Sequence, residues 1–306
     1  MIKVGIAGAD TPTGGELFRI LANHPDVDIT EAYAPGHKGM EASGIHHGLI
    51  GEREVRLDDS LDLSGLDVLF VCRRDDTVMS LLRSMPQGLR LVDVSEERHD
   101  TPLAEEMIYG LSEIYRKAMV RGGTRASVPR NTSSLALVSL YPLATHLLLG
   151  DDLKLRFIFP AGEAPDAEFL RGTAYDVERH LRVAQQSFSH KVEVNGEENP
   201  DERRRVLRMR ASLTTSVTLE EIRRAYNEVY DDHSFSFIVA GSPDAREVES
   251  THKCIVGLAK PDSHTLEIDA IADIRMRGGA AEGVHLLNLL CGLAERTGLS
   301  LKANVL

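Results

Sequence analysis

A strand, a glycine-containing turn and a helix open the chain, and this order constrains the fold more than any other feature. Residues 2–7 form an almost continuous apolar run, and Gly8 and Gly14 bracket the turn that follows. Residues 14–23 then place apolar side chains at helical spacing. An apolar strand that enters a helix through such a turn is typical of a parallel sheet with helices on both faces.

The pattern changes character near the middle of the chain. The first part alternates strands with helices, with further strands expected at 27–33, 68–72 and 89–94. After a helix expected at 133–148, strands predominate: 153–159, 187–194, 206–218, 234–239, 253–259 and 266–272, with helices at 167–184 and 219–230. The sequence therefore predicts an α/β fold: a Rossmann-type doubly wound parallel sheet plus an α+β domain with a largely antiparallel or mixed sheet.

Two domains are expected because 306 residues exceed one hydrophobic core. We expect residues 1–130, with a C-terminal helix and tail at about 279–306, to form the first domain, and residues 131–278 to form the second. Within these, residues 280–296 read as an amphipathic helix and the charged residues 195–202 as an exposed hairpin loop.

The overall composition excludes several classes of protein. A hydrophobic content of 42% is too high for a disordered chain, and a net charge of −12 argues against a general nucleic-acid binder. No apolar stretch reaches the length of a membrane span. The three cysteines, Cys72, Cys254 and Cys291, lack metal-ligand spacing and read as reduced, buried thiols. We expect a cytoplasmic protein without a membrane or nucleic-acid partner.

The turn after the first strand has the features of a pyrophosphate site. Gly8 and Gly14 permit close backbone approach at a helix N-terminus, where free N–H groups attract anions. Thr11 occupies the middle position of the usual glycine spacing, Pro12 lacks an N–H donor, and Thr13 completes the turn. We expect these five residues to bind a dinucleotide. The alternative is a tight strand-to-helix turn without a ligand.

The segment after the second strand indicates the cofactor. No acidic residue for a ribose 2′-hydroxyl follows Glu31, whereas His37 and Lys38 suit a 2′-phosphate. The sequence therefore favours NADP, and NAD remains the alternative because a solvated surface lysine is also common.

Several separated segments carry a more specific pattern. They are Gly8-Ala9 with Thr13-Gly14-Gly15-Glu16-Leu17, His24-Pro25-Asp26-Val27-Asp28-Ile29, Leu91-Val92-Asp93-Val94-Ser95, Tyr109-Gly110-Leu111-Ser112-Glu113-Ile114 with Arg116, Pro142-Leu143, and Asp273 with Arg277-Gly278-Gly279-Ala280-Ala281 and Asn288-Leu289. In this order they resemble N-acetyl-gamma-glutamyl-phosphate reductases and, more distantly, aspartate-semialdehyde dehydrogenases.

The resemblance implies a chemistry and its residues. The family reduces an acyl phosphate to a semialdehyde with NADPH, a step of arginine biosynthesis, through a cysteine thiolate at a helix N-terminus. It implies that Ser95 and Asn288 contribute to cofactor binding and that Arg116 and Arg179 bind the substrate phosphate. It also implies a small-molecule substrate, a catalytic and dimerisation role for the second domain, and a homodimer or homotetramer.

This sequence departs from the family at the chemical centre. In the register set by Pro142, Asn131 stands at the cysteine position and Arg130 precedes it, where it would bind phosphate or fill space. The residues that follow, Thr132, Ser133 and Ser134, suit helix capping. His180 remains from the family's His-Arg-His segment as a candidate acid or base, the alternative being a helix-surface histidine.

Three functions remain open from the sequence. The first is an NADP-linked oxidoreductase of the N-acetyl-gamma-glutamyl-phosphate reductase type. The second is an inactive or repurposed paralogue that binds nucleotide as a regulatory partner. The third is a carbonyl oxidoreductase without a covalent intermediate, with the carbonyl held by Arg130, Asn131 and His180.

Overall fold

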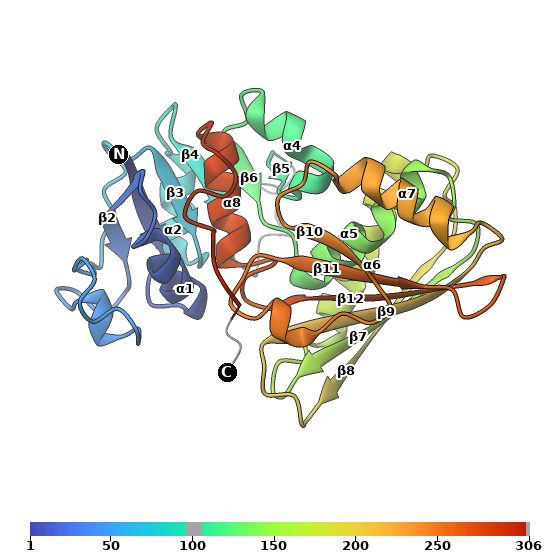
Figure 1. The fold of residues 1–306 in the computed structure, drawn as a ribbon. Helices are drawn as coiled ribbons and strands as arrows, with labels where there is room; N and C mark the ends of the chain where they lie inside the picture. The colour runs from blue at the N-terminus through green and yellow to red at the C-terminus, as the bar shows by residue number, and fades with distance from the viewer. Residues whose placement is uncertain (96–105, 304–306) are drawn as a thin grey trace. The chain divides into compact units, whose positions relative to one another are not determined.

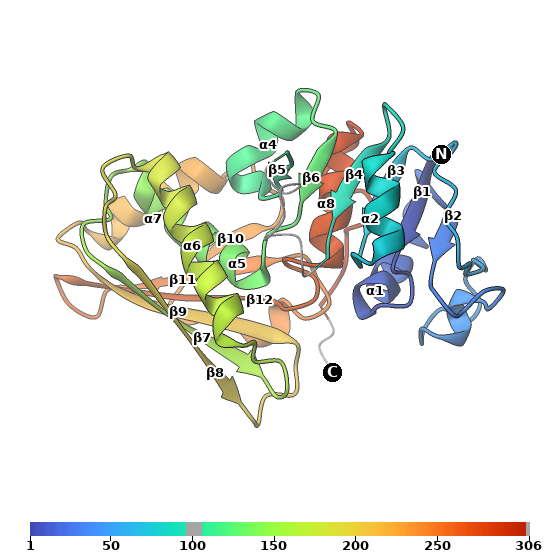
Figure 2. The ribbon, with the colours of Figure 1, turned by 180° about the vertical axis from the view of Figure 1, so that it is seen from behind.

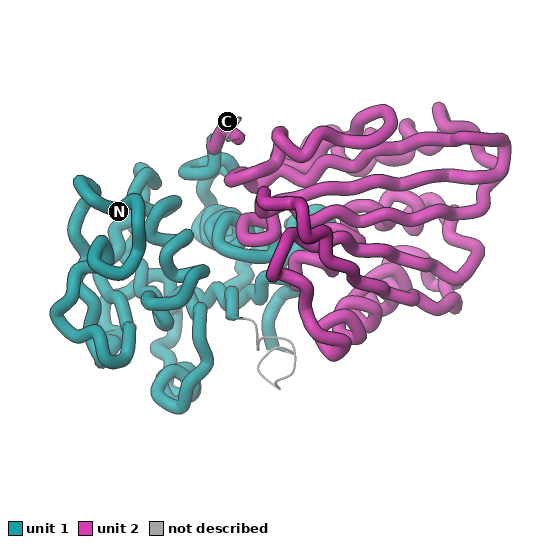
Figure 3. Tube along the Cα trace, turned by 90° about the horizontal axis from the view of Figure 1, so that it is seen from below, with its two compact units in different colours: residues 1–129, 278–300 teal, residues 130–277, 301–306 magenta. Residues whose placement is uncertain are grey.

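The computed structural model describes residues 1–95 and 106–303, and the chain divides into two compact units (Figure 3). Unit 1 comprises residues 1–129 and 278–300, and unit 2 comprises residues 130–277 with the described part of the C-terminal segment, 301–303.

Unit 1 is built on a six-stranded parallel sheet with the strand order β2-β1-β3-β4-β6-β5 (Figure 1). Its elements are β1 (Ile2–Ala7), α1 (Pro12–Leu21), β2 (Val27–Tyr33), η1 (Ala42–Gly44), β3 (Val68–Val71), α2 (Asp76–Arg83), β4 (Arg90–Asp93), β5 (Ile108–Tyr109), α4 (Ser112–Val120), β6 (Arg125–Ser127) and α8 (Ala280–Leu290). The carboxyl ends of β1 to β4 therefore meet at one edge of the sheet.

Helices cover both faces of this sheet because alternate residues of each strand point to opposite faces. Leu69 of β3 packs in a cluster with Val78 and Leu82 of α2. Phe70, the next residue, faces α8: a Cβ on Gly283 would lie 3.2 Å from its ring. All four residues of β3 are buried, as expected for a parallel strand covered on both faces.

Unit 2 contains a six-stranded mixed sheet with the order β10-β11-β12-β9-β7-β8. Its elements are α5 (Asn131–Thr145), β7 (Leu153–Pro160), α6 (Ala167–Ala184), β8 (Val192–Asn199), β9 (Val206–Thr214), α7 (Leu219–Tyr230), β10 (Ser236–Ala240), η3 (Ala245–Glu247), β11 (Cys254–Ala259) and β12 (Thr265–Asp273). The pairs β7–β8 and β10–β11 are parallel and the other pairs antiparallel. This arrangement confirms the predicted fold class.

The three long helices of unit 2 lie on one face of its sheet (Figure 2). In β7, Leu153, Leu155 and Phe157 are buried, while Lys154 and Arg156 between them are exposed. This two-residue period leaves a charged face opposite the helices. Among the described residues, no helix has both the length and the apolar character needed to cross a bilayer.

Several expected boundaries are wrong. The strand expected at 187–194 begins only at residue 192, the strand expected at 206–218 ends at 214, and the helix expected at 133–148 spans 131–145. Residues 195–199 belong to β8 instead of a hairpin loop, because an edge strand pairs through its backbone and tolerates exposed polar side chains. Helix α8 ends at Leu290 instead of 296. Gly292 adopts φ +70° and the Leu293 amide donates to the Asn288 carbonyl at 2.8 Å, so the helix closes in a left-handed C-terminal turn.

Helix α5 contains Pro142, which cannot donate a hydrogen bond to the Val138 carbonyl. Helix α7 compensates: the Tyr230 hydroxyl donates to the Val138 carbonyl at 2.7 Å, and Tyr226 donates to the Ser139 carbonyl. Both tyrosines are buried, so the Tyr230 hydroxyl replaces the backbone donor that Pro142 lacks, and Tyr226 adds a second bond one residue further along α5.

Replacing Tyr230 with phenylalanine should leave the Val138 carbonyl buried without its donor. We expect Tyr230→Phe to lower the free energy of unfolding by about 1–2 kcal/mol, measured by urea denaturation. Tyr175→Phe is the matched control because its side chain is exposed on α6, and it should change stability by less than about 0.5 kcal/mol. Equal stability of the two variants would contradict the compensating role of Tyr230.

Candidate functional site

The turn between β1 and α1 depends on its two glycines. Gly8 adopts φ +87°, and a Cβ on Gly14 would lie 2.7 Å from the Gly8 carbonyl oxygen. Thr11 caps α1: its hydroxyl accepts from the Gly14 amide at 3.0 Å and donates to the Gly8 carbonyl at 2.8 Å. The backbone is therefore tight enough to require glycine at both positions.

The same turn retains two backbone amides without a partner among the described residues. Pro12 has no N–H, and the amides of Gly14 and Gly15 are used by Thr11. Within the described part of the chain, the amides of Asp10, in the turn, and Thr13, at the start of α1, have no partner. Free amides at the positive end of a helix attract anions, so this turn has the chemistry of a phosphate site.

Residues at the end of β2 lie beside this turn. The Gly8 amide donates to the Tyr33 carbonyl at 3.0 Å, and His37 and Lys38 follow in the next loop. The exposed Lys38 ammonium lies 3.2 Å from the Asp58 carboxylate. Hydrogen bonds from Ser60 lower the pKa of Asp58, so this carboxylate is charged and oriented toward Lys38.

The other residues expected to bind the cofactor or the phosphate of the substrate in unit 1 have protein partners. Ser95 lies at the end of β4, where its amide and hydroxyl donate to Asp93. Arg116 contacts Glu295 at 2.5 Å. Asn288 is fully buried and bonds His24 and the carbonyls of residues 295 and 297. Ser95 thus lies at the same sheet edge as the glycine turn, whereas Arg116 and Asn288 belong to a cluster around Glu295.

In unit 2, Asn131 is the first residue of α5. Its side-chain nitrogen Nδ2 donates to the Ile274 carbonyl at 3.2 Å, and its Oδ1 accepts from the Thr132 amide at 2.7 Å. The carboxamide is half-buried and held by both ends. An amide nitrogen is not a nucleophile, so this position can donate and accept hydrogen bonds only.

Arg130 is committed to helix α6. Its buried guanidinium lies 3.0 Å from Asp176, which also accepts from the Ser133 hydroxyl at 2.9 Å. The guanidinium also lies over the Phe169 ring, 5.5 Å from its centroid, and against the backbone of Gly172. These contacts fix the first turn of α5 on α6.

His180 and Arg179 point in different directions from α6. His180 is buried one turn beyond Asp176, and burial, with a smaller effect of Arg179, lowers the pKa of its imidazole to about 4. The Arg179 side chain is exposed. The structure therefore groups Arg130, Asn131 and Asp176 at the start of α5, while Arg179 faces solvent.

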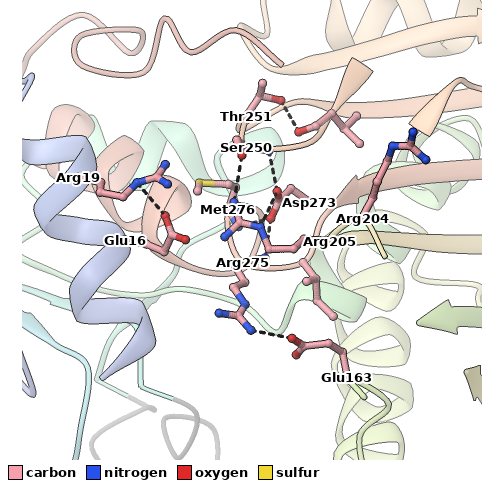
Figure 4. Close-up of polar contacts among 12 residues, drawn as sticks. Glu16, Arg19, Glu163, Arg204, Arg205, Ser250, Thr251, Asp273, Arg275 and Met276 are labelled. Carbon is pink, nitrogen blue, oxygen red and sulfur yellow. Dashed lines mark hydrogen bonds and ion pairs between the residues drawn. The ribbon is translucent and has the colours of Figure 1, made fainter. Parts of the chain in front are cut away.

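The sequence reasoning did not assign a role to the turn that follows β12 (Figure 4). The Asp273 carboxylate accepts from the amides of Ser250, Arg275 and Met276, and burial raises its pKa. This turn presents the Ile274 carbonyl to Asn131. The buried Arg277 then donates to the Ser134 hydroxyl at 2.7 Å. The sequence signal for this turn was the spacing of Asp273 and Arg277, which lie four residues apart in a motif shared with the resembling family.

Comparisons with known proteins agree with this geometry. Residues 3–121 match the family described as semialdehyde dehydrogenase, NAD binding domain, so unit 1 is a nicotinamide dinucleotide-binding unit. Over 99% of both chains, the sequence is 30% identical to N-acetyl-gamma-glutamyl-phosphate reductase of Parabacteroides distasonis and 31% identical to that of Phocaeicola vulgatus.

Solved structures show the same fold. Aspartate semialdehyde dehydrogenase with NADP from Candida albicans matches with a TM-score of 0.71 at 13% identity, covering 95% of this chain and 98% of that one. Aspartate semialdehyde dehydrogenase II from Vibrio cholerae also gives 0.71 at 13% identity, with 95% and 99% covered. With the full-length similarity above, these results place the chain in the N-acetyl-gamma-glutamyl-phosphate reductase family.

Proposed function

We propose that this protein is an NADP-dependent oxidoreductase that interconverts an acyl phosphate and a semialdehyde, as its relatives' name indicates. The observation that carries the proposal is full-length similarity to N-acetyl-gamma-glutamyl-phosphate reductases together with a glycine turn shaped for a dinucleotide. The substrate is a small molecule. We expect the protein to act in the cytoplasm as a homodimer or homotetramer.

The preference for NADP rests on Lys38. Its partner Asp58 is also exposed, and solvent screens such surface ion pairs so that they contribute little to stability. A 2′-phosphate carries more charge than one carboxylate and can therefore take over the Lys38 ammonium. His37 lies next to it and supplies a second nitrogen donor.

Substitutions at Lys38 and Asp58 should separate the two cofactors. We expect Lys38→Ala to weaken NADPH binding by about tenfold and NADH binding by less than about twofold, because only NADPH carries the 2′-phosphate. Asp58→Asn should strengthen NADPH binding alone. Isothermal titration calorimetry gives both affinities. Equal losses for NADPH and NADH in Lys38→Ala would assign another residue to the 2′-phosphate.

Asn131 takes a different role from the family's thiol. Cys254, the cysteine of unit 2, lies buried in β11, so the described residues at the start of α5 include no thiol. The nicotinamide cofactor, when bound, supplies hydride. We propose that the carbonyl carbon accepts this hydride directly and then expels phosphate. Asn131 Nδ2 has a second N–H beside the one given to Ile274, and it donates to the carbonyl oxygen as negative charge develops.

The substrate phosphate needs a positively charged partner other than Arg130, which is held by Asp176 at the start of α5. Arg130 is paired with Asp176 and Arg116 with Glu295. Of the three arginines expected from the sequence, Arg179 keeps an exposed guanidinium without an ion pair to any described residue. We propose Arg179 for this role, because it lies three residues after Asp176 on α6 and its exposed guanidinium can reach a ligand from solvent.

The test of the reaction is phosphate-dependent NADP reduction with N-acetylglutamate semialdehyde. We expect wild-type activity that iodoacetamide does not abolish, and about a tenfold or greater loss of kcat in Asn131→Ala. Asn227→Ala, exposed on α7, is the control and should retain full activity. Asn131→Cys should gain a thiol that reacts quickly with iodoacetamide, because the N-terminus of α5 stabilises a thiolate.

Two results would contradict the proposed reaction without a catalytic cysteine. Wild-type protein that binds NADPH but shows no turnover would favour the nucleotide-binding paralogue without catalysis. Wild-type activity that iodoacetamide destroys would mean that a cysteine is still used, and Cys254→Ser would be the variant to examine first.

His180 gives the fold a defined acid sensitivity. Its pKa near 4 keeps the imidazole neutral at pH 7, so it acts there as a hydrogen-bonding group instead of a charged acid. Because the folded pKa lies below the ordinary value of 6.5, the unfolded chain takes up the proton first. The corresponding stability is complete above about pH 6.5 and is lost as the pH falls toward 4.

Unfolding measured by urea at several pH values should show this directly. We expect wild type to lose about 3 kcal/mol between pH 7 and pH 4 through His180. His180→Gln should have a flatter profile, whereas His47→Gln, an exposed control, should follow wild type. Parallel profiles for wild type and His180→Gln would show that His180 does not titrate as described.

A further inference from the structure

Two adjacent arginines follow β3, at the sheet edge that carries the glycine turn. Arg74 is buried and bonded to the fully buried Asp93, which ends β4. Arg73 is different: about a third of its side chain is exposed, and its Nη2 lies 2.8 Å from the Asp10 carboxylate. Arg74 therefore supports the sheet, while Arg73 remains accessible from the edge.

Arg73 lies directly against the turn. A Cβ on Gly8 would meet the Arg73 Cβ at 2.7 Å and its backbone nitrogen at 3.0 Å. Asp10, its partner, is itself a turn residue between Gly8 and the Thr11 cap. One oxygen of Asp10 bonds Arg73, and the other, Oδ1, is buried without a hydrogen-bond partner among the described residues.

The Asp10 carboxylate makes the turn unfavourable for an anion, and the Arg73 guanidinium can offset this repulsion. A carboxylate within the turn repels the two negative charges of a pyrophosphate, and the turn itself offers no positively charged side chain, only the amides of Asp10 and Thr13. A guanidinium has five N–H donors in a planar fork, so Arg73 can keep Asp10 on Nη2 while Nε and Nη1 remain for a phosphate.

We propose that Arg73 binds the cofactor's pyrophosphate and that Asp10 is the positioning residue that holds its guanidinium beside the turn. The inference rests on the proposed cofactor site and adds a residue that the glycine pattern does not indicate. Pro12 lacks an N–H and Thr11 uses the amides of Gly14 and Gly15, so the start of α1 offers few free donors to a phosphate. Arg73 supplies additional donors and a positive charge there.

Affinities for NADPH and NADH, measured by calorimetry on the intact protein, test this proposal. Both cofactors carry the pyrophosphate, so Arg73→Ala should weaken both equally, by about tenfold to a hundredfold. Arg73→Lys should lie between, because one ammonium replaces a two-pronged contact. Arg83→Ala is the control: it is exposed on α2, and both affinities should stay within about twofold of wild type.

A double variant separates direct contact from simple charge masking. Asp10→Asn alone should tighten both cofactors, since it removes the repelling negative charge but keeps a side-chain oxygen that can accept from Arg73. If Arg73 contacts phosphate, Arg73→Ala with Asp10→Asn should remain at least about fivefold weaker than Asp10→Asn. If the double variant binds as tightly as Asp10→Asn, Arg73 only masks Asp10 and the proposal is wrong.

The failures are distinguishable. Wild-type binding of both cofactors with an Arg73→Ala affinity equal to that of Arg83→Ala would overturn the role of Arg73 and leave the cofactor site intact. A loss confined to NADPH would place Arg73 on the 2′-phosphate and also overturn the proposal. Wild-type protein that binds neither cofactor at millimolar concentration would overturn the cofactor assignment itself, and this inference with it.

Discussion

The buried ion pair between Arg130 and Asp176 fixes the local geometry on which the unit 2 site depends. It joins the residue before α5 to the middle of α6, and Ser133 adds a second donor to the same carboxylate. Removing one member of such a pair leaves a buried charge without compensation, a cost of several kcal/mol. The start of α5, and with it the Asn131 carboxamide, is thereby held in one orientation.

Helices α6 and α7 of unit 2 were the most predictable elements because their starts carry local signals, whereas α5 begins at Asn131 without a side-chain cap. Helix α7 begins after Thr218, whose hydroxyl and Glu221 form a reciprocal capping box, and α6 begins after the capping Asp166. The helical spacing of their apolar residues predicted the length of both helices. The sequence predicts a strand at 187–194 but a loop over the second half of β8, residues 195–199, because the side chains there are polar and exposed. Its membership of the sheet depends on backbone bonds to β7, which no side-chain pattern reveals.

The site was predictable to a different degree in each unit. The glycine turn is local, so its tight backbone at Gly8, Thr11 and Gly14 could be predicted from spacing alone. The partner of Arg130 lies 46 residues away on another helix, and that of Asn131 lies 143 residues away, so neither follows from local sequence. Resemblance supplied the position of Asn131, but its bonding to Ile274 required the packed structure.

Strand β8 has a consequence for how the protein behaves in a crowded solution. It lies at the outer edge of its sheet, where one row of backbone groups has no neighbouring strand in the sheet order. Glu193, Glu197 and Glu198 place negative charge along this edge. An edge of this kind repels the same edge of another molecule, which discourages strand-to-strand aggregation. The polar sequence that obscured the strand thus also keeps its exposed edge from nucleating fibres.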